Sequence, residues 1–260
     1  TGAMKVVTHA QELPSACAFV PTMGALHAGH GSLFSLAKSY SENVVASIYI
    51  NPLQFENKDD LEKYPKTPER DIALAEEYGV THLWFPTYEE IYPEGFTRLT
   101  AGAISSLYEG ASRPGHFDGV VTVVRRLFDL VKPQYAIFGE KDFQQLALVR
   151  EIAEEVKIIA APIIRENDGL AMSSRNVRLD EDGRVAARVI SKALRESRSE
   201  NELRSLLAQE PLFTLDYADY IDEETFLSPT STTRFTRAIV AGWINGVRLL
   251  DNMAVKSEVK

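Results

Sequence analysis

The chain has 260 residues, 45% hydrophobic and 25% charged, which is the composition of a globular protein with enough chain for one large domain or two modest ones. Its 28 Lys and Arg against 37 Asp and Glu give a formal charge of −9. That charge argues against binding nucleic acid or an anionic membrane through global charge, but it leaves room for a small anionic ligand at a locally positive site.

A single cysteine, Cys17, excludes an internal disulfide and a cysteine-based zinc cluster. It lies in an apolar run that is typical of a buried strand. No stretch approaches the ~20 apolar residues of a membrane span, and no signal peptide is visible. We therefore expect a cytoplasmic protein.

Short apolar runs alternate with helical patterns through the first two-thirds of the chain. The predicted strands are residues 16–21, 44–50, 82–85, 135–138 and 158–161. The predicted helices are residues 32–41, 67–79 and 120–131. The second of these helices is bounded by Thr67 and Pro68 at its start and by Gly79 at its end. This alternation predicts a parallel sheet with helices on both faces.

The pattern changes after about residue 175. The predicted elements there are helices at 180–198 and 200–209 and strands at 215–222, 237–244 and 247–252. Asn245-Gly246 between the last two is a strong hairpin signal. We predict an α/β fold with two domains: a domain with a Rossmann-like parallel sheet at 1–171, and a small α+β domain at 172–260. Ligands bind at the carboxyl ends of parallel strands, so the segments after Val20, Ile50 and Phe138 are the candidate site.

The segment after the first predicted strand reads P-T-M-G-A-L-H-A-G-H. Gly24 and Gly29 let the backbone approach a ligand, and the start of the next helix supplies free N–H donors. His27 and His30, three residues apart, can donate hydrogen bonds to phosphate oxygens. Structural histidines are the alternative. A zinc site is not favoured, because no cysteine and few carboxylates accompany the pair.

Five motifs together resemble the pantothenate synthetase (pantoate–β-alanine ligase) family of the H-x-G-H nucleotidyltransferase superfamily. They are the string that ends at His30, N-P-L-Q-F at 51–55, R-P-G-H-F at 113–117, G-E-K-D-F-Q-Q at 139–145 and M-S-S-R-N at 172–176. They follow one another in the family's order, and the resemblance extends over about residues 16–255.

The resemblance implies that His30, His27 and Lys141 are catalytic, acting on charge at the phosphates. It also implies an ATP site. The site would be made of the string that ends at His30, the segment after the predicted strand at 135–138 and the M-S-S-R loop. One further residue would contact adenine through its main chain. Those residues are Met23, Gly24, Ala25, Leu26, His27, Ala28, Gly29, His30, Gly139, Glu140, Lys141, Asp142, Ile164, Met172, Ser173, Ser174 and Arg175.

Two amides, Gln54 and Gln145, are implied to bind pantoate, and Gln54 also to help place β-alanine. From spacing alone, Gln54 is also compatible with a solvated loop residue, and residues 139–145 with a solvated helix start. Four roles stay open. Arg113 and His116 either approach the phosphates or only shape their loop. Tyr64 either binds or packs, and Asp71 either binds or only favours the first turn of its helix.

The sequence departs from the family at three positions. Gly31 follows the signature where the family usually has leucine, which predicts a looser helix start. Arg70 and Leu74 stand where some members carry polar or acidic residues suggested to help with magnesium. We therefore predict no protein ligand for a metal.

The resemblance implies a two-step ligation in which pantoate and ATP give pantoyl adenylate and β-alanine then gives pantothenate and AMP. The domain at 1–171 would bind the nucleotide and pantoate, and the domain at 172–260 would be a lid with a hinge loop at 172–176. Mg²⁺ would be bound mainly through the ATP phosphates. The partners would be these small molecules and a second copy in a homodimer, without nucleic acid or membrane. Two alternatives stay open: an H-x-G-H nucleotidyltransferase that makes a dinucleotide product, and a catalytically silent ATP-binding module.

Overall fold

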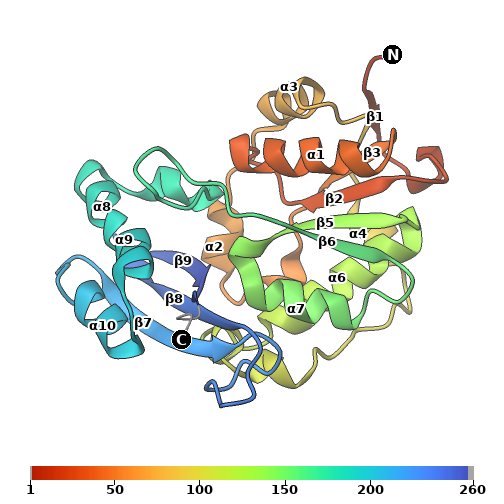
Figure 1. Cartoon of the computed structure of the whole chain (residues 1–260). Helices are drawn as coiled ribbons and strands as arrows, with labels where there is room; N and C mark the ends of the chain where they lie inside the picture. Colours follow the sequence, from red (N-terminus) through yellow and green to blue (C-terminus); the bar gives the residue numbers. More distant parts are fainter. Residues whose placement is uncertain (1, 257–260) are drawn as a thin grey trace. The chain divides into compact units, whose positions relative to one another are not determined.

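The computed structural model describes residues 2–256. The chain divides into two compact units, Thr1–Pro162 and Ile163–Lys260 (Figure 1). The predicted boundary was after residue 171, whereas the units divide after Pro162, nine residues earlier. Residues 172–176 therefore lie within the second unit.

The first unit contains a six-stranded, fully parallel sheet in the order β1-β4-β3-β2-β5-β6. Its strands are β1 (Lys5–Val7), β2 (Ala18–Thr22), β3 (Val44–Ile48), β4 (His82–Trp84), β5 (Tyr135–Gly139) and β6 (Lys157–Ala161). The five strands expected from the sequence all form, with ends shifted by one or two residues. Strand β1, a three-residue strand at the edge of the sheet, was not predicted.

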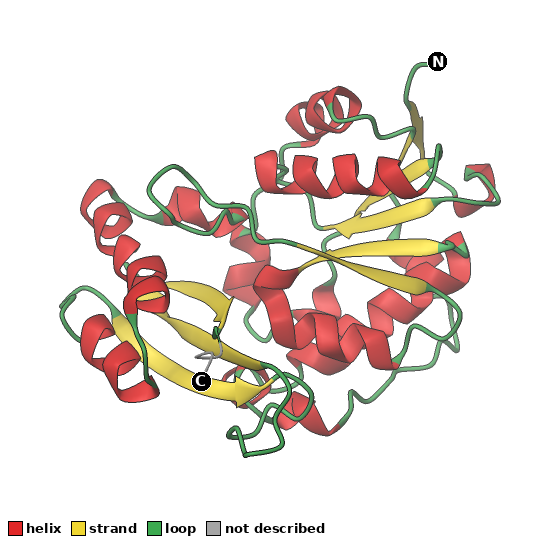
Figure 2. Cartoon of the chain, in the orientation of Figure 1, coloured by secondary structure: helices red, strands yellow, loops and turns green. Residues whose placement is uncertain are grey.

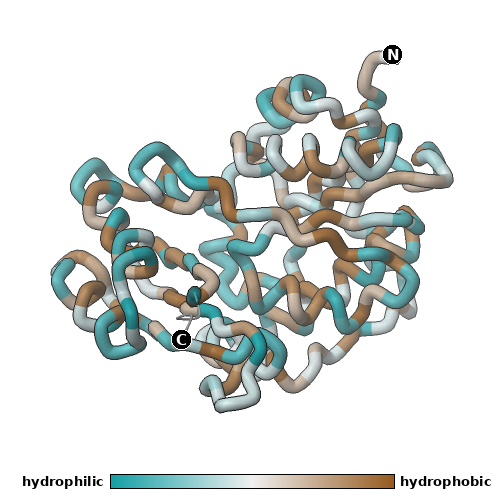
Figure 3. Tube along the Cα trace, viewed as in Figure 1, coloured by the Kyte–Doolittle hydropathy of each residue, from teal (hydrophilic) through white to brown (hydrophobic). Residues whose placement is uncertain are grey.

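Helices α1 (Ala28–Tyr40) and α3 (Pro68–Glu77) cover one face of this sheet, and α6 (His116–Val131) and α7 (Phe143–Glu151) cover the other (Figures 1 and 2). The unit also contains the shorter helices α2 (Lys58–Lys63), α4 (Tyr88–Ile91) and α5 (Glu109–Ser112). Successive strand residues point to opposite faces, so Ala18 and Val20 of β2 pack in the cluster that includes α1 and α3. Phe19 packs in the cluster with α6 and α7. Burial on both faces explains the continuous apolar runs that predicted these strands (Figure 3).

The order of the strands fixes where a ligand can bind. From β2 the chain moves outward through β3 and β4, and β5 then returns to pair with the other side of β2. The strand order therefore reverses between β2 and β5, and ligands of open α/β sheets bind at the carboxyl ends of the strands at such a point. The segments that leave β2 and β5 are the H-A-G-H loop and G-E-K-D-F-Q-Q.

The second unit is an α+β fold, as the sequence predicts. Three helices, α8 (Glu181–Ala186), α9 (Arg188–Glu196) and α10 (Glu200–Leu207), precede an antiparallel sheet of β7 (Thr214–Asp222), β8 (Thr236–Ile244) and β9 (Val247–Ala254). Asn245 (φ 53°) and Gly246 (φ 71°) form the expected tight turn. The single helix expected over 180–198 is interrupted at Ala187, whose N–H is shared between the carbonyls of Gly183 and Val185.

None of the helices in residues 2–256 combines the length and the apolar composition needed to cross a membrane.

Helix α1 begins four residues earlier than predicted, at Ala28, so both signature histidines lie at its first turn. Gly31 does not loosen this start, because the N-cap residue His27 accepts a hydrogen bond from the Gly29 N–H. A Cβ at Gly31 would instead lie 2.5 Å from Cζ of Tyr78, the residue that ends α3. The missing side chain makes room for the tyrosine ring.

We expect Gly31→Leu to lower the free energy of unfolding by about 1–3 kcal/mol, because the new side chain must displace the Tyr78 ring from a packed position. Chemical denaturation measures the change. The double variant Gly31→Leu/Tyr78→Ala should recover part of the loss, since the ring is then absent. Strictly additive losses in the double variant would contradict this packing explanation.

Candidate active site

The loop between β2 and α1 is shaped by a carboxylate from α3. Gly24 (φ 82°) and Ala25 (φ 49°) both lie in the left-handed region, which turns the next N–H groups to one side. The N–H groups of Ala25 and Leu26 donate to Asp71 at 3.1 and 2.8 Å, and the Thr67 hydroxyl donates to the same carboxylate at 2.9 Å. Asp71 is 1% exposed. It therefore holds the loop, a role that its position in the sequence left open.

The two histidines at the end of this loop lie at the start of α1, where backbone N–H groups fix the tautomer of each ring. Nδ1 of His27 accepts a hydrogen bond from the Gly29 N–H at 3.0 Å, and Nδ1 of His30 accepts from the His27 N–H at 3.1 Å. In a neutral imidazole whose Nδ1 accepts, Nε2 carries the proton. Both side chains are therefore Nε2–H donors, with ring centroids 4.2 Å apart.

Both imidazoles are neutral at pH 7. Burial, followed by the nearby Lys141 ammonium, lowers the pKa of His27 to about 4. Burial, followed by His27, lowers the pKa of His30 to about 3. Because β2 and β5 are parallel neighbours in the sheet, the segment after β5 leaves the sheet beside the H-A-G-H loop. The fold therefore brings these three residues together, and Lys141 supplies the positive charge beside two neutral donors.

The segment after β5 continues from Gly139 through a 3₁₀ turn, η4 (Glu140–Asp142), into α7. On α7, the buried Gln144 side chain donates to the carbonyls of Ile104 and Leu107 at 2.9 and 2.8 Å and accepts from the Glu109 N–H at 3.0 Å. The amide thus fixes the chain from η3 (Ala103–Ser106) into α5. Gln145 is the next residue on α7.

The segment after β3 forms η2 (Pro52–Gln54), and the buried Asn51 organises it. The Asn51 amide donates to Oε1 of Gln54 at 2.9 Å and to the Gly119 carbonyl at 3.0 Å. Its oxygen accepts from the hydroxyl of Tyr92 at 2.6 Å. Asn51 and Tyr92 were not among the residues predicted for the site. The asparagine of N-P-L-Q-F was the available signal, whereas nothing local marks Tyr92.

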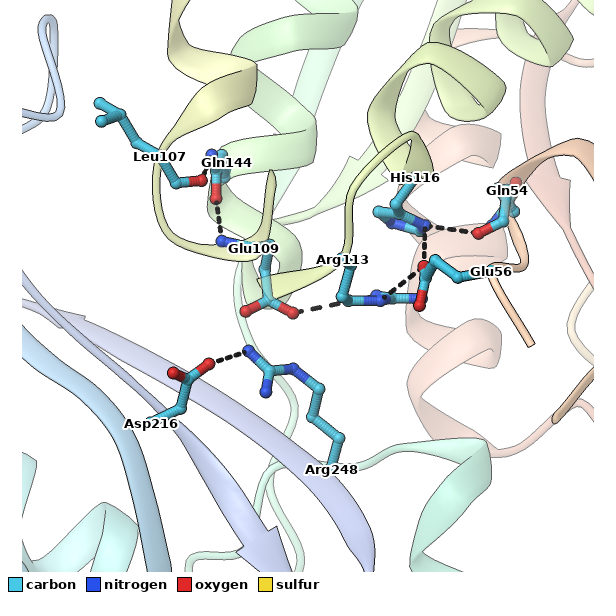
Figure 4. A network of polar contacts seen from close by, with 9 residues as sticks. All are labelled: Gln54, Glu56, Leu107, Glu109, Arg113, His116, Gln144, Asp216 and Arg248. Carbon is cyan, nitrogen blue, oxygen red and sulfur yellow. Dashed lines mark hydrogen bonds and ion pairs between the residues drawn. The ribbon is translucent and has the colours of Figure 1, made fainter. Parts of the chain in front are cut away.

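The R-P-G-H segment adjoins η2 (Figure 4). Nδ1 of His116 donates to the Gln54 carbonyl at 2.8 Å. Burial and then the Arg113 guanidinium lower the His116 pKa to about 4, so the ring is a neutral donor at pH 7. Arg113 contacts two carboxylates, Glu56 at 3.3 Å and Glu109 at 3.8 Å. Of the two roles left open for this motif, these contacts support the shaping of the loop.

Tyr64 packs edge-on against Phe55, with ring centroids 5.9 Å apart.

The remaining predicted residues lie in the second unit. Ile164 and Met172 meet through a hydrogen bond from the Met172 N–H to the Ile164 carbonyl at 2.9 Å. Ser173 caps η5 (Ser174–Arg178), accepting from the Arg175 N–H at 3.2 Å. Arg165 holds the hairpin that precedes this segment, through two hydrogen bonds to the buried Asp251 at 2.6 and 2.8 Å. The M-S-S-R segment therefore begins from a firmly anchored hairpin.

Within residues 2–256, no three His, Cys, Asp or Glu side chains are grouped in a way that could hold a metal ion. Asp71, the buried carboxylate of the H-A-G-H loop, instead accepts hydrogen bonds from Ala25, Leu26 and Thr67.

The chain is similar to known proteins over almost its whole length. A family model described as pantoate-beta-alanine ligase matches residues 2–254. The pantothenate synthetase of Thermus thermophilus is 43% identical, with 97% of this chain and 99% of that protein covered. That of Chlorobium luteolum is 42% identical, with 90% and 89% covered.

Solved structures agree. The crystal structure of the Thermus thermophilus pantothenate synthetase matches with a TM-score of 0.93, covering 98% of this chain and 100% of that one. The Francisella tularensis pantoate-beta-alanine ligase, in a complex with beta-gamma ATP and beta-alanine, matches at 33% identity with a TM-score of 0.85, covering 98% and 99%. This chain therefore belongs to the pantoate-beta-alanine ligase family, whose members are ligases that form a carbon–nitrogen bond.

Proposed function

We propose that this chain condenses (R)-pantoate with β-alanine to form pantothenate, at the expense of ATP, through a pantoyl-adenylate intermediate. The main support for the proposal is that the family model matches residues 2–254. In addition, the structure of one relative is a complex with beta-gamma ATP and beta-alanine. The site geometry of the first unit suits the chemistry, with neutral donors and one ammonium gathered at the carboxyl ends of β2 and β5.

The reaction has two group-transfer steps. A pantoate carboxylate oxygen attacks the α-phosphorus of ATP, the bond from that phosphorus to the bridging oxygen breaks, and pyrophosphate leaves. The amine nitrogen of β-alanine then attacks the acyl carbon of the adenylate, the bond to the AMP oxygen breaks, and the nitrogen loses a proton. Negative charge develops on phosphate oxygens in both steps. Catalysis therefore requires hydrogen-bond donors that are positioned to stabilise this charge.

His27 and His30 are proposed to donate their Nε2–H groups to the α-phosphate, and Lys141 to stabilise the departing pyrophosphate. The tautomers support this role, because each Nδ1 accepts from a backbone N–H and each proton is on Nε2. A neutral imidazole donates without a protonation step, whereas the ammonium supplies charge.

The other ATP contacts follow the family pattern. We propose the backbone of Met23, Gly24, Ala28 and Gly29, with Gly139, Glu140 and Asp142, for the nucleotide, and the main chain of Ile164 for adenine. Ala25 and Leu26 belong to the same loop, but their N–H groups are committed to Asp71 and their contribution is to its shape. Met172, Ser173, Ser174 and Arg175 would hold the pyrophosphate through hydroxyl and guanidinium donors.

Pantoate is assigned to Gln54 and Gln145. An amide can donate to a carboxylate and accept from a hydroxyl, which suits a small hydroxy acid. Mg²⁺ would enter with ATP and supply charge neutralisation at the phosphates, whose oxygens are the hard ligands it prefers. We assign it no protein ligand.

The family resemblance also supports a cytoplasmic homodimer. Light scattering on the purified chain should give twice the monomer mass. A monomer mass at the concentrations used for the assay would contradict the dimer.

Pantoate-dependent exchange of labelled pyrophosphate into ATP is the first test of the function. We expect exchange with pantoate alone, and net AMP and pantothenate formation once β-alanine is added. A dinucleotide product would favour the nucleotidyltransferase alternative. Absence of exchange would favour a silent ATP-binding module.

His30→Asn tests the donor role separately from the capping role. The asparagine Oδ1 can replace Nδ1 as acceptor for the His27 N–H, but the Nε2–H donor is lost. We expect single-turnover adenylate formation to slow on the order of 10²–10³-fold, the usual loss for one transition-state donor. The melting temperature should stay close to that of the wild type. Unchanged adenylate formation in this variant would remove His30 from the mechanism.

A further inference from the structure

A network of polar contacts in the first unit, partly buried, connects the two segments that carry Gln54 and Gln145 (Figure 4). It begins at η2, where the His116 side chain donates to the Gln54 carbonyl at 2.8 Å. Helix α6 also contacts this turn directly: a Cβ at Gly119 would lie 2.3 Å from the Leu53 carbonyl oxygen. The backbone of the Gln54 turn is therefore seated on the first turn of α6.

The network continues through Arg113. Its guanidinium lies between Glu56, two residues after Gln54, and the buried Glu109 on α5. A guanidinium matched by two carboxylates has its charge compensated within the protein, so it is poorly suited to bind the phosphates of ATP. It instead ties the end of the Gln54 segment to α5.

The last connection is Gln144. Its amide accepts from the Glu109 N–H and donates to two carbonyls of the preceding turn, which satisfies both donors and the acceptor. Gln144 precedes Gln145 on α7. The contacts therefore run from the Gln54 segment through Glu56 and Arg113 to the Glu109 side chain, and from the Glu109 backbone N–H to Gln144, the residue beside Gln145.

We propose that His116, Arg113 and Gln144 are positioning residues for pantoate, which set the separation of the Gln54 and Gln145 side chains. This inference rests on the proposed function, because it takes those two amides as the pantoate ligands. The physical basis is that His116, Glu109 and Gln144 are buried, and that hydrogen bonds between buried groups hold their partners in fixed positions. An error of about 1 Å in the placement of a substrate can slow a reaction by about 10²-fold.

The first test compares the Michaelis constants for pantoate and ATP in His116→Leu and in Gln144→Leu. We expect the KM for pantoate to rise about tenfold in each variant, the change typical of one lost buried hydrogen bond. The KM for ATP should stay within about twofold, because the network does not include the H-A-G-H loop or Lys141. Equal rises for both substrates would overturn the proposal.

Two further variants separate positioning from general stability. His116→Asn keeps an N–H donor at nearly the position of Nδ1, so it should restore most of the pantoate affinity. Thr122→Val is the matched control, since it removes another buried hydrogen bond of α6, from the Leu99 N–H at 3.0 Å. It should lower the melting temperature without raising the KM for pantoate. Failure of His116→Asn to improve on His116→Leu would contradict the assigned contact.

A double-mutant cycle tests whether His116 acts through Gln54. In a Gln54→Ala background, His116→Leu should change the KM for pantoate by less than about twofold, because the side chain being positioned is gone. Fully independent effects would overturn the inference while leaving the proposed function intact. A wild-type chain without pantoate-dependent exchange would overturn the proposed function itself, and the inference with it.

Discussion

The loop that carries the two histidines depends on one buried carboxylate. Gly24 and Ala25 both have positive φ, and the N–H groups of Ala25 and Leu26 turn to the same side, where one anion can accept both. Here that anion is Asp71 of the protein itself. A buried carboxylate is costly unless it is hydrogen-bonded, and three donors satisfy this one. The loop thus enters α1 at a fixed angle, and His27 becomes the N-cap.

Neutral histidines follow from that fixed entry. The capping hydrogen bonds use Nδ1 of both rings, and burial lowers both pKa values well below 7. The two rings therefore offer directed donors, and Lys141 is the cation that we propose for the phosphates of ATP. A chain with a formal charge of −9 can bind a polyanion in this way, because the site needs one well-placed cation and several dipoles rather than a basic surface.

The sequence predicted the elements with strong local signals and missed those that depend on distant contacts. Strands β2, β3 and β5 are apolar runs buried on both faces, and Asn245-Gly246 marks its turn by backbone chemistry alone. The start of α1 was placed too late because histidine is not a usual N-cap residue. The function of Asp71 is set by a contact across 45 residues, and the role of His116 by one across 62. No local pattern records either contact.

The proposed pantoate ligands are amides, and chemistry gives a reason. The pantoate carboxylate must act as a nucleophile in the first step. A bidentate guanidinium would bind it more tightly, but would also withdraw the electron density that attacks phosphorus. Neutral glutamine side chains orient the carboxylate and withdraw less electron density from it than a guanidinium would. The carboxylates of Glu56 and Glu109 serve the same end, since they engage Arg113, whose partner Glu56 lies two residues after Gln54. In the proposed mechanism, the network that positions the amides thus also keeps a competing guanidinium occupied, which couples the position of the substrate to its reactivity.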